Sequence, residues 1–188
     1  MFDANANMLR EATGTSEVVR VARALAAALE RFQIPHLVVG GLAVQEHGYP
    51  RMTIDADIVV PDVLEAAEFA TADVAGPLLR MPGAPDRLRD RKYGVIIDLL
   101  PAGGVARAGN KVPFPHPTVA SDELQIVSLP QLISLKLDSW AGSPARRLRD
   151  KSDVVELILR RLLPRDYDVS PAVRELYERT WDELRAES

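Results

Sequence analysis

The stretch from residue 37 to residue 60 constrains the fold more than any other part of the sequence. It reads LVVGGLAVQEHGYPRMTIDADIVV, which predicts a short buried strand ending at two glycines, a short helix, a turn and a second strand. The second strand carries Asp55 and Asp57, whose side chains leave the same face roughly 6 to 7 Å apart, given a rise of about 3.3 Å per residue. This spacing indicates either a shared cation site or an ordinary solvated strand face.

The alternation along residues 52–60 separates a core face from an acidic face. Ile54, Ala56 and Ile58 form the face that we expect to pack in the core. Thr53, Asp55, Asp57 and Val59 share the opposite face.

A later apolar strand, predicted over residues 93–100, has one acid in its interior, Asp98. A carboxylate in the middle of VIIDLL is expensive to bury unless a partner, water or a metal compensates for it. If the two strands are neighbours, about 4.8 Å apart, Asp98 joins Asp55 and Asp57 on one face. Crowded acids repel one another and stay partly protonated unless divalent cations supply positive charge. Magnesium fits this oxygen-only set, because it prefers carboxylates, waters and phosphates.

Gly40 and Gly41 complete the pattern. Because they lack Cβ atoms, they let a phosphate approach the backbone, and the helix that follows offers free N–H groups and the positive end of its dipole. A Gly-Gly pair alone is more often a tight turn. Glycines, helix start and acids together predict a nucleoside triphosphate site.

The composition narrows the chemistry further. The chain has no cysteine and three scattered histidines, which excludes thiol catalysis and argues against zinc clusters. A net charge of -4 argues against binding nucleic acid through bulk charge. No apolar run approaches the roughly 18 residues of a membrane span, and residues 1–11 lack a signal-peptide pattern, so we expect a cytoplasmic protein without a membrane partner.

The remaining pattern predicts an α/β (α+β) chain in two parts, with strands and helices over residues 1–127 and helices over residues 128–188. The core helices are expected over residues 16–32 and 62–75, the second capped by Asp62. A short strand is expected over residues 124–127, and a loop with at most an edge strand over 80–92. The C-terminal helices are expected over residues 128–140, 143–163 and 170–185, the second with Leu148, Val155, Ile158 and Leu162 on its inner face.

Three more side chains are candidates for the site. Arg51 either contacts phosphates or is a turn residue, and Thr53 either supports Asp55 or is an ordinary strand former. Lys136 lies on the apolar stripe of its helix, where it either extends to the surface or faces the cleft to bind triphosphate. We favour the cleft.

Two basic runs suggest an anionic partner, either substrate phosphate or RNA. One lies at Arg146, Arg147, Arg149 and Lys151, and the other at Arg80, Arg87, Arg89, Arg91 and Lys92. The plainer interpretation, which we favour, is a solvated basic face paired with neighbouring acids.

Residues 18 to 160 resemble the nucleotidyltransferase superfamily of the DNA polymerase beta type. The resemblance is carried by a hydrophobic residue before Gly40-Gly41, 13 intervening residues, Asp55-Ala-Asp57-Ile, and Asp98 on a later strand. The fuller strings GGLAVQEHGYPRMTIDADIVV, SLPQLISLKLDSW and RDKSDVVEL are similar to a small bacterial group that includes abortive-infection-type toxins. The sequence departs from that group at Arg149-Asp150, where Lys-Asp is frequent.

The resemblance implies that Asp55 and Asp57 bind Mg²⁺ and the triphosphate of ATP or another NTP. It implies that Asp98 completes a two-metal site and helps to deprotonate the attacking hydroxyl, and that Gly40 and Gly41 hold the phosphates. In such a mechanism one ion activates the acceptor and the other steadies the leaving pyrophosphate. The net reaction transfers a nucleotide to a hydroxyl. The resemblance also implies the fold, a mixed β-sheet core flanked by helices over residues 1–127, with the helical part of residues 128–188 packed on it.

The acceptor stays open at this point. A toxin-like enzyme would modify tRNA or another cellular target and would have a cognate toxin or antitoxin partner, whereas an antibiotic-modifying enzyme would act on an aminoglycoside-like hydroxyl. The basic runs favour tRNA slightly. A different class of function is a non-catalytic, nucleotide-binding antitoxin or regulatory partner.

Overall fold

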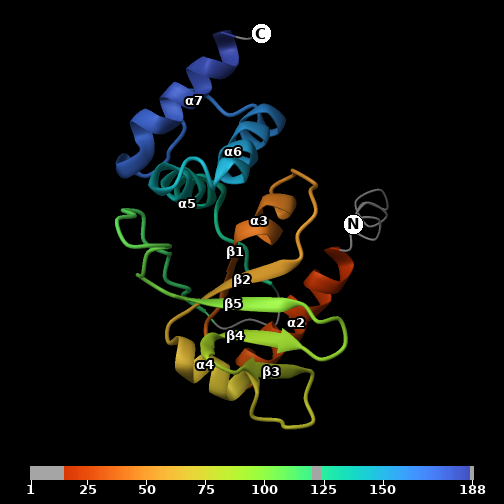
Figure 1. Cartoon of the computed structure of the whole chain (residues 1–188). Helices are drawn as coiled ribbons and strands as arrows, with labels where there is room; N and C mark the ends of the chain where they lie inside the picture. Colours follow the sequence, from red (N-terminus) through yellow and green to blue (C-terminus); the bar gives the residue numbers. More distant parts are fainter. Residues whose placement is uncertain (1–14, 120–123, 187–188) are drawn as a thin grey trace.

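The computed structural model describes residues 15–119 and 124–186. The N-terminal residues in which we expect no signal peptide lie outside that part. The described chain forms a five-stranded sheet in the order β1-β2-β5-β4-β3, with helices on both sides (Figure 1). The strands are β1 (Leu37–Val39), β2 (Asp55–Val60), β3 (Leu78–Met81), β4 (Ala84–Asp90) and β5 (Ile96–Pro101). The helices are α2 (Thr15–Glu30), α3 (Gly40–Glu46), α4 (Val63–Ala70), α5 (Leu129–Gly142), α6 (Leu148–Arg161), the 3-10 helix η1 (Pro171–Val173) and α7 (Arg174–Ala186).

The sheet is mixed, as predicted: β2 and β5 are parallel, and the other neighbouring pairs are antiparallel. Alternate residues of β2 and β5, such as Ala56, Ile58 and Ile97, pack against α2 and α4 in one buried cluster. This face of the sheet is therefore closed. Asp62 caps α4 as expected, because its carboxylate accepts hydrogen bonds from the N–H groups of Leu64 and Glu65.

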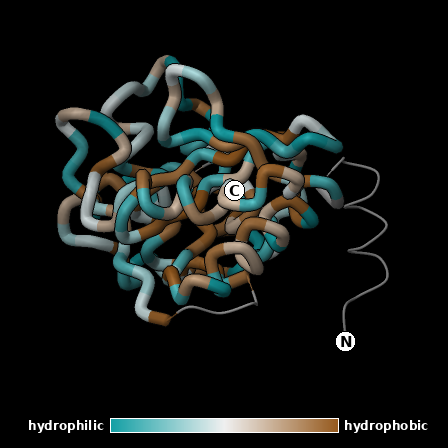
Figure 2. Tube along the Cα trace, turned by 90° about the horizontal axis from the view of Figure 1, so that it is seen from below, coloured by the Kyte–Doolittle hydropathy of each residue, from teal (hydrophilic) through white to brown (hydrophobic). Residues whose placement is uncertain are grey.

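The C-terminal helices α5, α6 and α7 form a group beyond the β1 edge of the sheet, next to α3 (Figure 1). Their buried residues form one cluster with Val39 of β1, Val59 of β2 and Val44 of α3. The cluster thus joins the sheet to the helical part. Seen from below, many hydrophobic stretches run through the middle of the molecule, while the peripheral loops are mainly hydrophilic (Figure 2). None of the described helices is long and apolar enough to cross a membrane.

Residues 80–92 form most of a β-hairpin, so the expectation of a loop there was wrong. β3 and β4 pair antiparallel, with Leu78 opposite Asp90 and a register shift at Met81. The alternation of apolar and polar residues that is typical of a strand is not apparent in this part of the sequence, because the hairpin lies at the sheet edge and its outward positions carry charges. Only Leu88 of its central residues is fully buried.

Two other strand predictions need correction. Ile54 was expected in the core but is 74% exposed, because β2 begins only at Asp55 and Thr53 is buried instead. Residues 124–127 do not form a strand: Ile126 makes a single bridge to Val38, with hydrogen bonds on either side of it.

The inner face of the helix predicted over residues 143–163 was also partly wrong. The helix begins at Leu148, and Leu148 and Leu162 are both exposed. The buried positions are Asp150, Asp153, Val154, Leu157 and Ile158, which recur at steps of three and four. Counting only apolar residues missed this stripe, because two of its members are acids that find buried cationic partners.

The long loop after β5 is fastened to α5 by one buried acid. The carboxylate of Asp138 accepts hydrogen bonds from the N–H groups of Lys111 and Val112, at 2.9 and 3.0 Å, and the side-chain amide of Asn110 donates to the Asp138 carbonyl at 2.7 Å. Closer to its ends, the Phe114 N–H donates to the Gly104 carbonyl at 2.7 Å. The loop therefore has a defined position beside α5.

We predict that Asp138→Ala lowers the free energy of unfolding by about 3 kcal/mol, because the buried N–H of Val112 and the partly buried N–H of Lys111 lose a charged acceptor. Urea denaturation measures the change, and Asp86→Ala, which removes an exposed acid on β4, is the control. Hydrogen exchange should accelerate at Lys111 and Val112. An unchanged midpoint together with unchanged exchange would show that Asp138 does not hold the loop.

Candidate functional site

Three charged side chains lie in one row across the open face of the sheet. Asp57 on β2 pairs with Asp98 on the parallel strand β5, and Asp98 pairs in turn with Arg87 on β4. The condition under which Asp98 joins the other two acids, that the two acidic strands be neighbours, is therefore met. Asp55 is two residues before Asp57 on the same face. The structure brings the three acids to one face, with Asp57 and Asp98 directly side by side.

The two glycines lie at the start of α3, immediately after β1, and the site side chains press against them. Gly40 has φ of +61°, and a Cβ there would overlap the carboxylate of Asp57. A Cβ at Gly41 would overlap the hydroxyl of Thr53. Glycine is therefore needed at both positions by the chain's own side chains, whatever else approaches the helix start.

The negative charge around Asp57 is only partly compensated by nearby cations and hydrogen-bond donors. Burial, together with the neighbouring carboxylates of Asp55 and Asp98, raises the pKa of Asp57 to about 6, against the opposing effects of Lys136 and of a hydrogen bond from the Gly41 N–H. A cation placed among these acids would favour the ionised form of Asp57.

Asp98 is engaged by Arg87. The guanidinium Nε of Arg87 donates to the Asp98 carboxylate at 2.6 Å, and the two side chains are 51% and 22% exposed. The sequence placed Arg87 only in a basic run. The missing signal was the strand period of β4, which puts Arg87 opposite Asp98 once the register is known.

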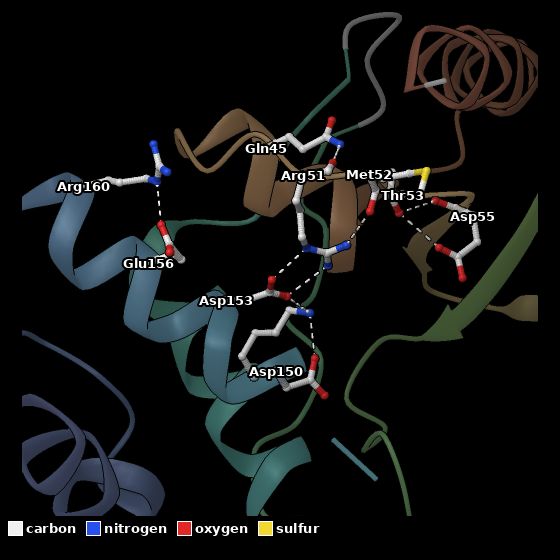
Figure 3. Close-up of polar contacts among 10 residues, drawn as sticks. Gln45, Arg51, Met52, Thr53, Asp55, Asp150, Asp153, Glu156 and Arg160 are labelled. Carbon is white, nitrogen blue, oxygen red and sulfur yellow. Dashed lines mark hydrogen bonds and ion pairs between the residues drawn. The ribbon is translucent and has the colours of Figure 1, made fainter. Parts of the chain in front are cut away.

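A buried network of two cations and two anions lies beside the acids (Figure 3). The Oδ2 of Asp153 on α6 accepts a hydrogen bond from Arg51 at 3.0 Å, and its Oδ1 lies 2.7 Å from the Arg51 Nε in the same ion pair. The Nζ of Lys136 is 2.8 Å from Asp153 and 2.8 Å from Asp150. Burial alone would lower the pKa of Lys136, but the charges of Asp153 and Asp150 outweigh it and raise the pKa, so Lys136 stays charged.

The same network continues to Asp55. Arg51 donates to the Met52 carbonyl at 3.0 Å, its own carbonyl accepts from the Gln45 side chain, and the Thr53 hydroxyl donates to the Asp55 carboxylate at 3.2 Å (Figure 3). Arg51 thus holds the segment before β2 against α6, and Thr53 contacts Asp55. Of the two alternatives for Arg51, contact with phosphates stays a prediction, and in the structure the guanidinium is paired with Asp153.

A cavity of about 190 Å³ adjoins the acids and is lined by both signs of charge. Of the predicted site residues, Gly40, Asp57 and Lys136 line it, so Lys136 faces this cavity. Sequence reasoning missed three other charged lining residues, Arg107, Arg147 and Asp150. Arg147 and Asp150 appeared only as parts of a basic face, and nothing in the sequence of the long loop singled out Arg107.

The acids suit a hard divalent cation in their chemistry, because all donors are carboxylate oxygens. Within residues 15–119 and 124–186, no group of three or more His, Cys, Asp or Glu side chains is arranged to hold a metal ion. Arg87 engages one of the two carboxylate oxygens of Asp98. Asp55 and Asp57, followed by Asp98, are the residues that fit the ion.

Comparisons with known proteins give a likeness of fold. No protein family matches the sequence, and no curated protein does so. Among solved structures, five chains match, and one of them is the solution structure of the antibiotic-resistance factor ANT(2'')-Ia, described as having substrate-regulated conformation dynamics. The likeness covers 92% of this chain and 95% of that chain with a TM-score of 0.53 and 16% sequence identity. The mixed sheet with its C-terminal helices is consistent with a nucleotidyltransferase fold.

Proposed function

We propose that this protein is a magnesium-dependent nucleotidyltransferase, which moves a nucleotide from an NTP to a hydroxyl acceptor. The observation that carries the proposal is the parallel pairing of β2 and β5, which sets Asp57 beside Asp98 with Asp55 on the same face. The start of α3 at Gly40 meets these acids, and the adjoining cavity carries Lys136 and two arginines. The fold likeness supports the same class of reaction.

In this proposal, Asp55 and Asp57 hold Mg²⁺, and Asp98 joins them when it leaves Arg87. The bound ion neutralises charge on the phosphates and on the three acids. The Gly41 N–H, which donates to Asp57, helps to fix that carboxylate at the helix start. Lys136, Arg107 and Arg147 line the cavity on the side where they would face the triphosphate. An oxygen of Asp98 accepts the proton of the attacking hydroxyl.

The acceptor is proposed to be a small molecule. Several cations of the basic runs that favoured tRNA are engaged within the fold: Arg87 pairs with Asp98, Lys151 with Glu183, and Arg91 donates to the carbonyls of Val74 and Gly76. Paired cations contribute little to counterion release on binding a polyanion. The fold neighbour is an antibiotic-resistance factor, which also favours a small acceptor. We retain a boundary near residue 128 between core and helical part as a proposal.

A pyrophosphate-release assay with each NTP, Mg²⁺ and a panel of hydroxyl acceptors tests the proposal. We expect Asp57→Asn and Asp98→Asn to lower the rate by about 100-fold or more, because each removes a carboxylate from the proposed metal site. Asp86→Asn, at an exposed position of β4, should keep the wild-type rate.

Two outcomes would contradict the proposal of an enzyme that acts on a small-molecule acceptor. NTP binding in a titration without pyrophosphate release for any acceptor would favour the non-catalytic, regulatory alternative. Growth arrest on expression, abolished by Asp57→Ala, together with transfer to tRNA rather than to small hydroxyls, would favour a toxin.

We predict that Arg87→Gln lowers the Mg²⁺ concentration needed for half-maximal pyrophosphate release severalfold, because Arg87 competes with the ion for Asp98. Arg89→Gln is the matched control, since it removes an exposed arginine two residues further along β4. The measurement is a magnesium titration at saturating NTP. Equal magnesium dependence in both variants would show that the ion pair with Arg87 does not compete with Mg²⁺ for Asp98.

The raised pKa of Asp57 predicts a pH-dependent stability of the metal-free protein. A carboxyl whose pKa is raised from 3.8 to about 6 stabilises the fold below pH 4 and loses this contribution as the pH rises through 6. In EDTA, the melting temperature of Asp57→Asn should therefore exceed that of the wild type by an amount that grows by several degrees from pH 4 to pH 7. Asp86→Asn is the control, and a gap independent of pH would show that Asp57 is not destabilised by its charge.

A further inference from the structure

A second, larger cavity adjoins the site cavity. It measures about 550 Å³ and lies between the long loop after β5, the start of α5 and η1. Phe114 and Leu135 line both cavities, so the two cavities meet at these residues. A volume of this size is typical of pockets that bind drug-sized molecules.

The two cavities differ in charge. The site cavity is lined by Asp57, Asp150, Lys136, Arg107 and Arg147, which suits phosphates and a cation. Among the described residues that line the larger cavity, the one ordinarily charged side chain is that of Asp168. That side chain is 98% exposed and lies 3.8 Å from Arg174, so it points into solvent. The larger cavity therefore has neither acidic side chains that would bind a polycation nor basic side chains that would bind a polyanion.

Its walls are apolar and stiff, with few polar groups. Pro113, Pro115, Pro130 and Pro171 all line it, and proline fixes the backbone φ. The hydroxyl of Ser134 is already used, because it donates to the Pro130 carbonyl at 2.7 Å and accepts from the Ser170 N–H at 2.9 Å.

Two polar side chains stand at the mouth of the cavity. Gln131 accepts from Ser128 at 2.9 Å through its carbonyl oxygen, which leaves its amide N–H groups to donate, and His116 is exposed nearby on the lining. A few donors on an otherwise apolar wall orient a ligand without demanding that it carry charge.

We infer that this larger cavity binds the acceptor, and that the acceptor is an uncharged, largely apolar alcohol or phenol of drug-like size. The inference rests on the proposed function, and it names the substrate class that the function leaves open. The ligand hydroxyl lies where the two cavities meet, at Phe114 and Leu135, and its oxygen attacks the α-phosphorus of the NTP. A new P–O bond forms to the acceptor, the bond to the bridging oxygen breaks, pyrophosphate leaves with the electron pair, and the hydroxyl proton passes to Asp98.

The first test is binding, measured without NTP. The probe is 2-naphthol at pH 7, a neutral aryl alcohol that is itself fluorescent, and kanamycin and bulk tRNA serve as the polycationic and polyanionic competitors. Gln131→Trp fills the mouth of the cavity from an exposed position of α5, and Arg149→Trp places the same bulk at an exposed position of α6 outside both cavities. We expect Gln131→Trp to weaken 2-naphthol binding by about tenfold or more, Arg149→Trp to leave it unchanged, and neither competitor to displace the probe.

The second test is transfer, measured as pyrophosphate release from ATP and Mg²⁺ with 2-naphthol, kanamycin or tRNA as acceptor. We expect release above the no-acceptor rate with 2-naphthol alone, and its loss in Gln131→Trp while ATP binding stays at the wild-type affinity. Release with kanamycin or tRNA but not with 2-naphthol would overturn the inference and leave the nucleotidyltransferase proposal standing. Binding of 2-naphthol that depends on Gln131, with no release for any acceptor, would uphold the neutral-ligand cavity and overturn the enzymatic function. Absence of 2-naphthol binding, or binding insensitive to Gln131→Trp, would overturn the assignment of the cavity.

Discussion

The crowding of carboxylates on one face of the sheet is the constraint on which the rest of the site depends. Parallel pairing of β2 and β5 sets Asp57 beside Asp98, and burial together with these neighbours raises the pKa of Asp57 to about 6. The chain compensates with cations on either side, Arg87 from the sheet and Lys136 from α5. The protein therefore carries a site whose negative charge is only partly neutralised, which is the condition that favours a divalent cation.

The buried network around Asp153 explains how distant parts of the chain serve one site. Breaking a buried ion pair by removing one partner leaves an uncompensated charge, which is strongly destabilising. Asp153 contacts both Arg51 and Lys136, so it fixes the approach to β2 and the cationic wall of the cavity at once. The C-terminal helices thus contribute side chains to the site, because α5 supplies Lys136 and α6 supplies Asp150 and Asp153.

Predictions from the sequence were correct where a local pattern of residues is enough to specify the structure. They were wrong where the burial of a residue depends on a partner that is distant in the sequence. The cap at Asp62 and the placement of Asp55 and Asp57 on one strand face follow from local patterns, and the structure confirms them, as it confirms the mixed sheet that the family resemblance implied. The inner face of α6 was misassigned because its acids are buried only through Lys136 and Arg51, which are far away in the sequence. The β3–β4 hairpin was missed because an edge strand with one solvated face has no clear apolar run.

The sequence by itself determined which residues could form an acidic site and which positions near it must lack a side chain. Asp55, Asp57 and Asp98 are acids set in apolar strands, and burial of a carboxylate demands compensation in any fold. Only the tertiary structure decided how that compensation is made: register brings Arg87 to Asp98, and helix packing brings Asp150 and Asp153 to Lys136. It also decided that a nearly uncharged cavity adjoins the charged one, since that cavity is enclosed by three segments separated in the chain. Such contacts depend on strand register and helix packing, which no local pattern of residues specifies.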